Sequence, residues 1–297
     1  MIRLAIRVRG EQAELALAEL LEFAPSGVEE VRLPDQTVEY AAYGAPGELP
    51  TLPDLKAAVG GALVEVSSSE VADDWQERWR RFHRPVLVET PGGRGRGAST
   101  VPAMRVRPPW EEPGAGRLAV EEIVIDPGQA FGTGAHASTR LCLALLLELA
   151  AMQRSRGALL DVGTGSGVLA IAAARLGFAP VLALDSDRAS VEAARANAAV
   201  NAAEIVVRPF DLRRQTLPWL DGEGARAGPV VVIANLLGPL LLELARTMPR
   251  APAHLLAGGL LPEQCEQTAR AFAARLDMRE RERRLCGPWA ALWLTAP

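Results

Sequence analysis

The chain has 297 residues, of which 49% are hydrophobic and 23% charged, as is usual for a globular protein with one large domain or a catalytic domain and a smaller companion. Its formal net charge of −4 gives no overall attraction to a nucleic-acid backbone. The three cysteines and three histidines are isolated along the sequence, which argues against a disulfide framework and a metal site and favours a reducing compartment.

The first ten residues alternate apolar and charged side chains, which is typical of a β-strand and not of the continuous apolar core of a signal peptide. No run reaches the roughly 18–20 apolar residues that a membrane-spanning helix needs. We therefore expect a cytoplasmic protein with no membrane partner.

Residues 1–66 are predicted to form a small α+β domain. Strand patterns cover residues 2–9, 28–33, 37–43 and 62–66, and helical patterns cover residues 12–23 and 52–59. This β-α-β-β-α-β order is that of a ferredoxin-like unit.

Residues 67–116 are predicted to form a linker region. Within it, Trp75, Trp79 and Phe82 have the spacing of one helix face. An aromatic stripe among arginines is compatible with a nucleic-acid surface, but its core-like spacing favours a linker helix that packs against a neighbouring domain. Further patterns are a glycine-rich loop at residues 91–98 and strands at residues 103–106 and 118–125.

Residues 117–297 are predicted to form an α/β domain. Strand patterns cover residues 158–162, 181–185, 204–207, 229–234 and 254–257, and helical patterns cover residues 139–151, 168–176, 189–200, 240–248 and 262–276. Strands that alternate with helices of about ten or more residues indicate a mostly parallel, Rossmann-like sheet. Final strand patterns at residues 278–285 and 289–295 are expected to add an antiparallel pair at the edge of this seven-stranded sheet.

A glycine-rich turn follows the first of these strands. Asp161 precedes Gly163, Gly165 and Gly167, and this D-x-G-x-G-x-G spacing favours S-adenosylmethionine over a dinucleotide. Glycine lets the backbone approach a ligand, and the next helix offers N–H groups to a carboxylate such as that of the methionyl moiety. Asp161 is expected to attract the ammonium of that moiety. The alternative is a tight turn without a ligand, which needs fewer glycines.

A carboxylate ends the second strand of the predicted sheet. Asp185 directly follows an apolar run and is expected to accept hydrogen bonds from the ribose hydroxyls of the cofactor. Asp187 competes for this role, and its alternative role is to cap the next helix.

An amide ends the strand at residues 229–234. Asn235 is expected to orient the nitrogen of an amine for methylation, together with the backbone carbonyl of Leu236. The alternative is that Asn235 caps the helix that begins near Leu240.

The segment at residues 125–139 precedes the sheet and is rich in glycine and helix-capping residues. We expect it to lie as a flap over the cofactor, with Phe131 as an apolar lid and Thr139 as a polar contact. His136 is a candidate general base, and its alternative role is to cap or steady the loop.

These pieces together resemble the ribosomal protein methyltransferase family PrmA over nearly the whole chain. The likeness includes the small N-terminal domain, the linker at residues 74–79, the segment at residues 126–139, the glycine turn and residues 234–237. The stretch from Phe131 to Gly134, with His136, is its most family-specific part, whereas the glycine turn occurs in many methyltransferases.

This resemblance implies a class I methyltransferase fold with S-adenosylmethionine as the cofactor. The cofactor contacts that it implies, together with those expected from the residues themselves, are Phe131, Gly132, Thr139, Asp161, Gly163, Gly165, Asp185 and Asn235, with Asn235 also the catalytic residue. The implied acceptor is the eleventh protein of the large ribosomal subunit, at the stalk base. Its N-terminal and lysine amino groups would be methylated, its recognition would belong to the N-terminal domain, and no nucleic acid would be required.

The sequence departs from the PrmA pattern in a few places. Ala137 replaces a common proline and Thr164 a common cysteine, and residues 92–97 and 221–228 have the character of insertions. Other functions to weigh are a methyltransferase for another protein or a small amine, a nicotinamide oxidoreductase, and a sensor that binds the cofactor without catalysis. The glycine spacing disfavours the second, and the intact Asn235 motif disfavours the third.

Overall fold

The computed structural model describes residues 2–13, 16–17, 28–44, 63–70, 83–89, 103–114, 120–127, 132, 134–153, 156–219 and 230–297. The chain divides into two compact units. One comprises Met1–Phe82 with Gly128–Phe131, and the other His83–Pro127 with Gly132–Pro297. The border at residue 82 lies inside the predicted linker region, whose exact limits stay a prediction.

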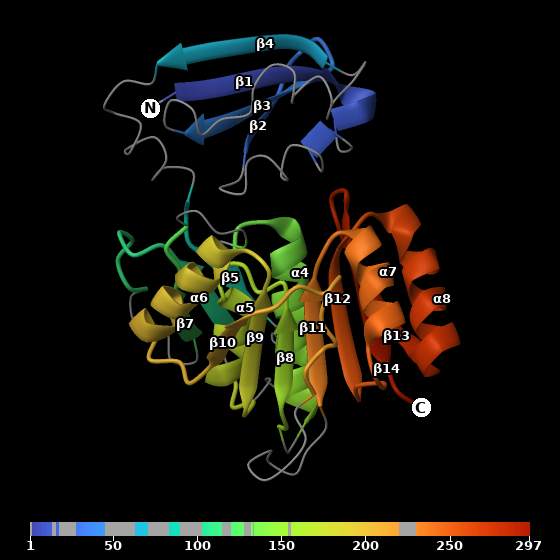
Figure 1. The fold of residues 1–297 in the computed structure, drawn as a ribbon. Coiled ribbons are helices and arrows are strands. Elements are labelled where there is room, and N and C mark those ends of the chain that lie inside the picture. Colours follow the sequence, from blue (N-terminus) through green and yellow to red (C-terminus); the bar gives the residue numbers. More distant parts are fainter. Residues whose placement is uncertain are drawn as a thin grey trace, which may run out of the picture. The chain divides into compact units, whose positions relative to one another are not determined.

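The first unit contains a four-stranded antiparallel sheet (Figure 1). Its strands, in the order β2-β3-β1-β4, are β1 Ile2–Arg9, β2 Glu29–Arg32, β3 Thr37–Gly44 and β4 Leu63–Glu70, and a 3-10 turn, η1 Gly10–Gln12, follows β1. Alternation along β1 puts Ile6 and Val8 in a small core, while Arg7 pairs with Glu39. All four predicted strands are confirmed. The two predicted helices and the aromatic stripe at residues 75–82 fall largely outside the described residues, so the ferredoxin-like assignment and the linker helix stay predictions.

The second unit is built on a seven-stranded sheet (Figure 1). Its strands are β8 Leu159–Val162, β9 Val181–Asp185, β10 Val206–Pro209, β11 Val231–Asn235, β12 His254–Leu260, β13 Arg279–Cys286 and β14 Trp289–Thr295. They lie in the order β10-β9-β8-β11-β12-β14-β13, and β14 is the one strand of this sheet that runs in the opposite direction to the other six. The mostly parallel sheet is confirmed, and the reversed strand lies inside the sheet, with β13 at its edge.

Five helices among the described residues accompany these strands, the first before β8 and the other four between later strands. They are α4 Ala137–Met152, α5 Val168–Arg175, α6 Arg188–Val200, α7 Gly238–Thr247 and α8 Cys265–Leu276, with a 3-10 turn, η3 Pro262–Gln264, before α8. All five predicted helices are therefore present. Two of them, α4 and α7, begin two residues earlier than predicted, and the helix predicted from Pro262 starts as the η3 turn.

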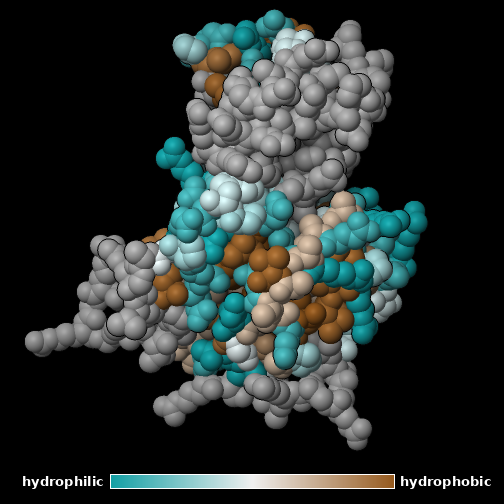
Figure 2. Space-filling model, turned by 90° about the vertical axis from the view of Figure 1, so that its left-hand side faces the viewer, coloured by the Kyte–Doolittle hydropathy of each residue, from teal (hydrophilic) through white to brown (hydrophobic). Residues whose placement is uncertain are grey.

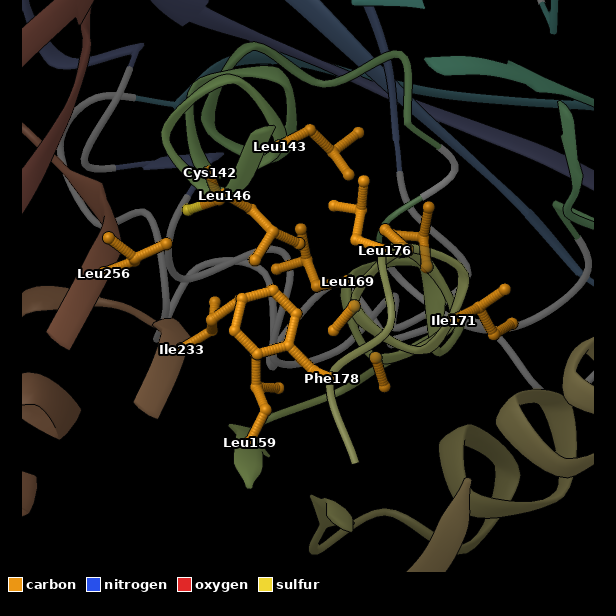
Figure 3. Packing of buried hydrophobic residues seen from close by; sticks show 14 of the residues in the cluster. Cys142, Leu143, Leu146, Leu159, Leu169, Ile171, Leu176, Phe178, Ile233 and Leu256 are labelled. Atoms are coloured by element: carbon orange, nitrogen blue, oxygen red, sulfur yellow. The ribbon is translucent and has the colours of Figure 1, made fainter. Parts of the chain in front are cut away.

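The sheet of the second unit is buried on both faces. Leu159, Ile233 and Leu256 belong to a cluster with side chains of α4, α5 and α6 (Figure 3). Their sequence neighbours Leu160 and Val232 belong to a second cluster, with side chains of α7 and α8. Burial of successive residues on opposite faces explains why these strands are continuous apolar runs.

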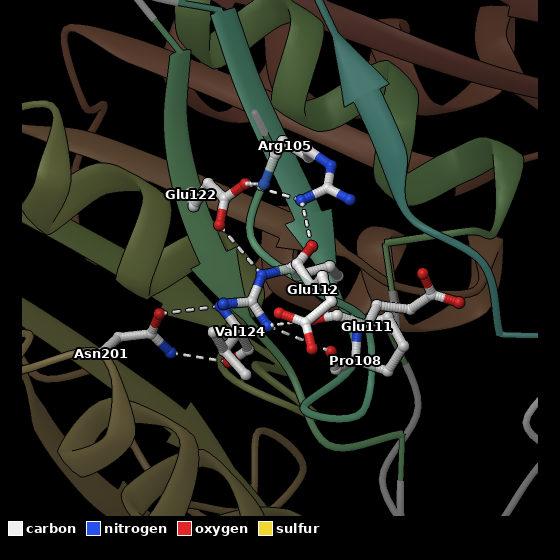
Figure 4. Close-up of polar contacts among 9 residues, drawn as sticks. Arg105, Pro108, Glu111, Glu112, Glu122, Val124 and Asn201 are labelled. Carbon is white, nitrogen blue, oxygen red and sulfur yellow. Dashed lines mark hydrogen bonds and ion pairs between the residues drawn. The ribbon is translucent and has the colours of Figure 1, made fainter. Parts of the chain in front are cut away.

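A three-stranded sheet accompanies the large one in the second unit. Its strands, in spatial order, are β5 Val86–Val88, β6 Ala103–Arg107 and β7 Val120–Val124. Glu122 on β7 accepts hydrogen bonds from Arg105 at 2.6 Å, from Arg107 at 2.9 Å and from the Gly114 N–H at 2.6 Å (Figure 4). Although partial burial opposes it, these bonds lower the pKa of Glu122 to about 2 and fix the loop after β6 onto β7. The strand β5 was not predicted.

The described surface is mixed in character. Figure 2 shows hydrophilic residues and hydrophobic patches side by side on one face of the second unit. None of the described helices is both long and apolar enough to cross a bilayer.

Candidate functional site

Three polar residues predicted from the sequence, Asp161, Asp185 and Asn235, come from the carboxyl-terminal parts of three adjacent strands, β8, β9 and β11. These strands are parallel, so their ends meet at one edge of the sheet, where ligands bind in open α/β folds. This edge is the candidate site.

The glycine turn after β8 adopts a backbone conformation that residues other than glycine rarely adopt. Gly163, Gly165 and Gly167 have φ angles of 74°, 53° and 84°, in the left-handed region. The N–H groups of Gly163 and Thr164 both donate to the carbonyl of Leu184 on β9, at 2.8 and 2.9 Å. A Cβ on Gly163 would also collide with the side chain of Leu236. The left-handed backbone therefore favours glycine at residue 163, and any side chain there would also have to displace the end of Leu236.

Asp161 is fully buried at the base of this turn. Its Oδ2 accepts hydrogen bonds from the Thr164 hydroxyl at 2.6 Å and the Ala170 N–H at 3.1 Å, but its Oδ1 finds no hydrogen-bond partner among the described residues. Burial raises the pKa of the Asp161 carboxyl to about 7, with the nearby charge of Asp185 adding to the shift. A buried carboxylate with an unused oxygen suits a cationic ligand group.

Asp185, at the end of β9, is hydrogen-bonded to the same turn. Its Oδ2 accepts from the Gly165 N–H at 2.8 Å, and its Oδ1 accepts from the Asp187 N–H at 3.0 Å. Burial raises the pKa of Asp185, against the lowering effect of these bonds. Asp187 is the N-cap of α6 and accepts from the N–H groups of Ala189 and Ser190, so its alternative capping role is confirmed.

Asn235 and Thr139, 96 residues apart, meet at the other side of the candidate site. The Nδ2 of Asn235 donates to the hydroxyl of Thr139 at 3.3 Å, and Thr139 is fully buried on α4. The Oδ1 of Asn235 is buried and has no partner in the described part of the chain. The N-cap of α7 is Leu237, without a side-chain bond, so the alternative that Asn235 caps this helix is wrong. The helix α7 begins at Gly238, two residues further on than a cap at Asn235 would require, and Pro239 lies in its first turn.

The segment before α4 is described only in part. Phe131 lies outside the described residues, and Gly132, with a φ angle of 98°, accepts a hydrogen bond from the hydroxyl of Ser166 at 2.6 Å. His136 is the N-cap of α4, where its Nδ1 accepts from the Ser138 N–H at 3.3 Å. Burial, with a contribution from Arg140, lowers the pKa of His136 to about 4. The capping alternative for His136 is confirmed, and a group with so low a pKa is a weak base for an amine.

Comparison with known proteins identifies the family. Residues 27–296 match the family model described as "Ribosomal protein L11 methyltransferase (PrmA)". The chain belongs to the PrmA family. It is 36% identical to the ribosomal protein L11 methyltransferase of Pelobacter propionicus over 234 residues, 76% of this chain and 68% of that protein. It is 39% identical to that of Symbiobacterium thermophilum over 190 residues, 63% of this chain and only 52% of that protein.

A solved structure supports the same assignment. The crystal structure of the ribosomal protein L11 methylase from Lactobacillus delbrueckii subsp. bulgaricus aligns with a TM-score of 0.56 and 27% identity. The alignment covers 71% of this chain and 98% of that one. The second unit therefore has the methyltransferase fold of the PrmA family, as the sequence predicts.

Several residues at the candidate site were not predicted. Ser166 and Asn197 hold the glycine turn through hydrogen bonds, and Gly258 on β12 leaves room for neighbours that a side chain would displace. The sequence holds a faint signal for Ser166, which lies inside the glycine motif, but none for Gly258, whose importance comes from contacts in space. Among the described residues, no cluster of three His, Cys, Asp or Glu side chains could hold a metal ion.

Proposed function

We propose that the chain transfers methyl groups from S-adenosylmethionine to amino groups of ribosomal protein L11, at its N-terminus and on its lysines. The observation that carries this proposal is the pair of buried oxygens without a described partner, Asp161 Oδ1 and Asn235 Oδ1, at the ends of β8 and β11 of a PrmA-family fold. Buried polar atoms are almost always bonded, so two of them at one sheet edge indicate ligand groups.

The residues at the sheet edge fit the cofactor. The Asp161 carboxylate would hold its ammonium and Asp185 its ribose hydroxyls, and the absence of side chains at Gly163 and Gly165 would let the backbone approach it. Phe131, Gly132 and Thr139 would complete the contacts. When bound, the cofactor supplies an electrophilic methyl group on a sulfonium centre.

The protein's task is then to present a neutral amine in line with that methyl group. A lysine has a reference pKa of about 10.4, so the site must favour its neutral form, and removal from water does so. The Oδ1 of Asn235 would accept an N–H of the amine and so direct the nitrogen lone pair, with the Leu236 carbonyl as a second acceptor. The Thr139 hydroxyl, which accepts from Asn235 Nδ2, fixes the orientation of the amide.

The cytoplasmic location and the acceptor rest on family likeness and are part of this proposal. Methylation of another protein or a small amine is the second candidate, because the first unit carries no chemical motif that identifies a partner. A variant without residues 1–66 separates these candidates. It should keep full activity on a small amine but lose activity on a docked protein.

The first test is to incubate the chain with radiolabelled S-adenosylmethionine and large-subunit ribosomal proteins that have not been methylated. We expect label on L11 alone. Label on other proteins, or none despite cofactor binding, would contradict the proposed acceptor while leaving the cofactor site intact.

The second test concerns Asn235 directly. Asn235→Ala should lower kcat by about 10²–10³-fold, because a polar group that acts on the reacting atoms is lost. Circular dichroism and thermal unfolding should show a folded protein, since Asn235 neither caps α7 nor fills the core. Unchanged methylation by this variant would refute the role of Asn235.

A further inference from the structure

Two asparagines lie one helical turn apart at the end of α6, Asn197 inside the helix and Asn201 at its C-cap. Asn197 and Asn201 are four residues apart and each is only 3% exposed. Buried amides are kept where their hydrogen bonds are satisfied, so their partners indicate their roles.

Asn201 pairs with the edge of the small sheet. Its Oδ1 accepts from the Val124 N–H at 2.9 Å and its Nδ2 donates to the Val124 carbonyl at 2.7 Å (Figure 4). It thus supplies both bonds that a neighbouring strand would give to the end of β7. Its Nδ2 also lies 2.7 Å from the carbonyl of Asn197 within α6. These contacts fix the end of α6 to β7, and none of these hydrogen bonds reaches the glycine turn.

Asn197 has the same chemistry but different partners. Its Oδ1 accepts from the Asp126 N–H at 3.0 Å, and its Nδ2 donates to the carbonyl of Ser166 at 2.8 Å. It therefore joins the chain that follows β7 to the glycine turn.

Ser166 continues this connection. It is fully buried, and its hydroxyl donates to the carbonyl of Gly132 at 2.6 Å. Two residues of the segment between β7 and α4, Asp126 and Gly132, are thus bonded to Asn197 and Ser166, which are also bonded to each other. These hydrogen bonds join neutral groups. If one of them is lost inside the buried site, its donor or acceptor is left without a partner.

We propose that Asn197 and Ser166 are positioning residues for the methyl donor: they hold Asp126 and Gly132 against the glycine turn and so set the affinity of the site for the cofactor. Neither side chain needs to touch the cofactor. This inference rests on the proposed function, because it concerns the same site. It adds a connection from α6 through the turn to the segment that carries Gly132.

Asn201 provides a matched control for Asn197. The two residues share amino-acid type and burial and lie one helical turn apart, and each bonds backbone groups outside α6, but only Asn197 bonds the glycine turn. We would compare Asn197→Ala, Asn201→Ala and Ser166→Ala for three quantities. These are the Kd of S-adenosylhomocysteine by calorimetry, the KM and kcat for S-adenosylmethionine, and the midpoint of thermal unfolding.

We expect the two asparagine variants to lose similar stability but to differ in binding. Asn197→Ala should weaken S-adenosylhomocysteine binding and raise KM by about tenfold, with kcat nearly unchanged, as the loss of two buried hydrogen bonds predicts. Ser166→Ala should give about half of that effect on a logarithmic scale, and Asn201→Ala should stay within twofold of the unmodified protein. Hydrogen exchange of the Asp126 amide should speed up in Asn197→Ala and not in Asn201→Ala.

Equal Kd values for folded Asn197→Ala and Asn201→Ala would overturn this proposal, as would an equal effect of both on Asp126 exchange. Failure of the unmodified protein to bind S-adenosylhomocysteine would instead overturn the proposed function, so the two failures are distinguishable.

Discussion

The two halves of the candidate site are built in different ways. In the glycine-turn half, Asp161, Gly163 and Gly165 lie within five residues, and the backbone itself supplies the left-handed conformations and N–H groups. In the other half, Thr139, Asn235 and Gly258 come from α4, β11 and β12 and meet only in the folded protein. The comparison teaches that local backbone conformation determines the geometry of the glycine-turn half, whereas tertiary packing determines the geometry of the half that holds Asn235.

Of the changes that compare the two halves, Gly163→Ala should have the largest effect on cofactor affinity. The alanine residue must adopt a left-handed φ, at a cost of about 1–2 kcal/mol, and its Cβ must displace the side chain of Leu236. We therefore expect cofactor affinity to fall about 10²-fold. Gly177→Ala is the matched control, because Gly177 also has a positive φ, of 87°, but ends α5 away from the site. It should lose similar stability and keep its Kd by calorimetry. Equal losses of affinity in both variants would mean that the turn acts only through stability.

Gly258→Ala tests the packed half. Its φ is ordinary, but the added Cβ would collide with the Cys142 sulfur and lie 2.9 Å from Asn235 Oδ1, so we expect about 1–3 kcal/mol of destabilisation. Cys142→Ala removes the main obstacle. In urea unfolding, the double variant should therefore be less destabilised than the sum of the two single variants. Strict additivity would show that the strand relaxes without help from Cys142.

A smaller effect, about tenfold, is expected from pH. Burial raises the pKa of Asp161 from 3.8 to about 7 in the folded protein. Between these values the folded state keeps a proton that the unfolded chain has lost, so this group's contribution to stability decreases as the pH rises from about 4 to 7. The cofactor ammonium favours the carboxylate, so its affinity should rise about tenfold between pH 6 and pH 8. Calorimetry on Asp161→Asn should show weak binding with no such rise, and an identical pH profile in both proteins would contradict the assignment.

The same contrast explains what the sequence could predict. Apolar periodicity and the glycine spacing predicted the strands and helices of the second unit, together with Asp161, Asp185 and the strand that ends at Asn235, because these signals are local. The sequence did not predict β5, which has only three residues, and it did not predict that the N-cap of α7 is Leu237. The bonds of Thr139 to Asn235 and of Asn197 to Ser166 join residues far apart in the chain. No periodicity records such contacts, so they emerge only from the fold.

The place of β14 has a consequence for synthesis of the protein. Trp289–Thr295 pairs with β12 on one side and β13 on the other, and both neighbours are translated before it. Until β14 emerges, a nascent chain exposes an unpaired edge on β12, and β13 has no place in the sheet. Open strand edges invite association with other chains. The alternating arginine and glutamate residues of β13 put charge on one such edge during that interval, which makes pairing with a foreign strand unfavourable.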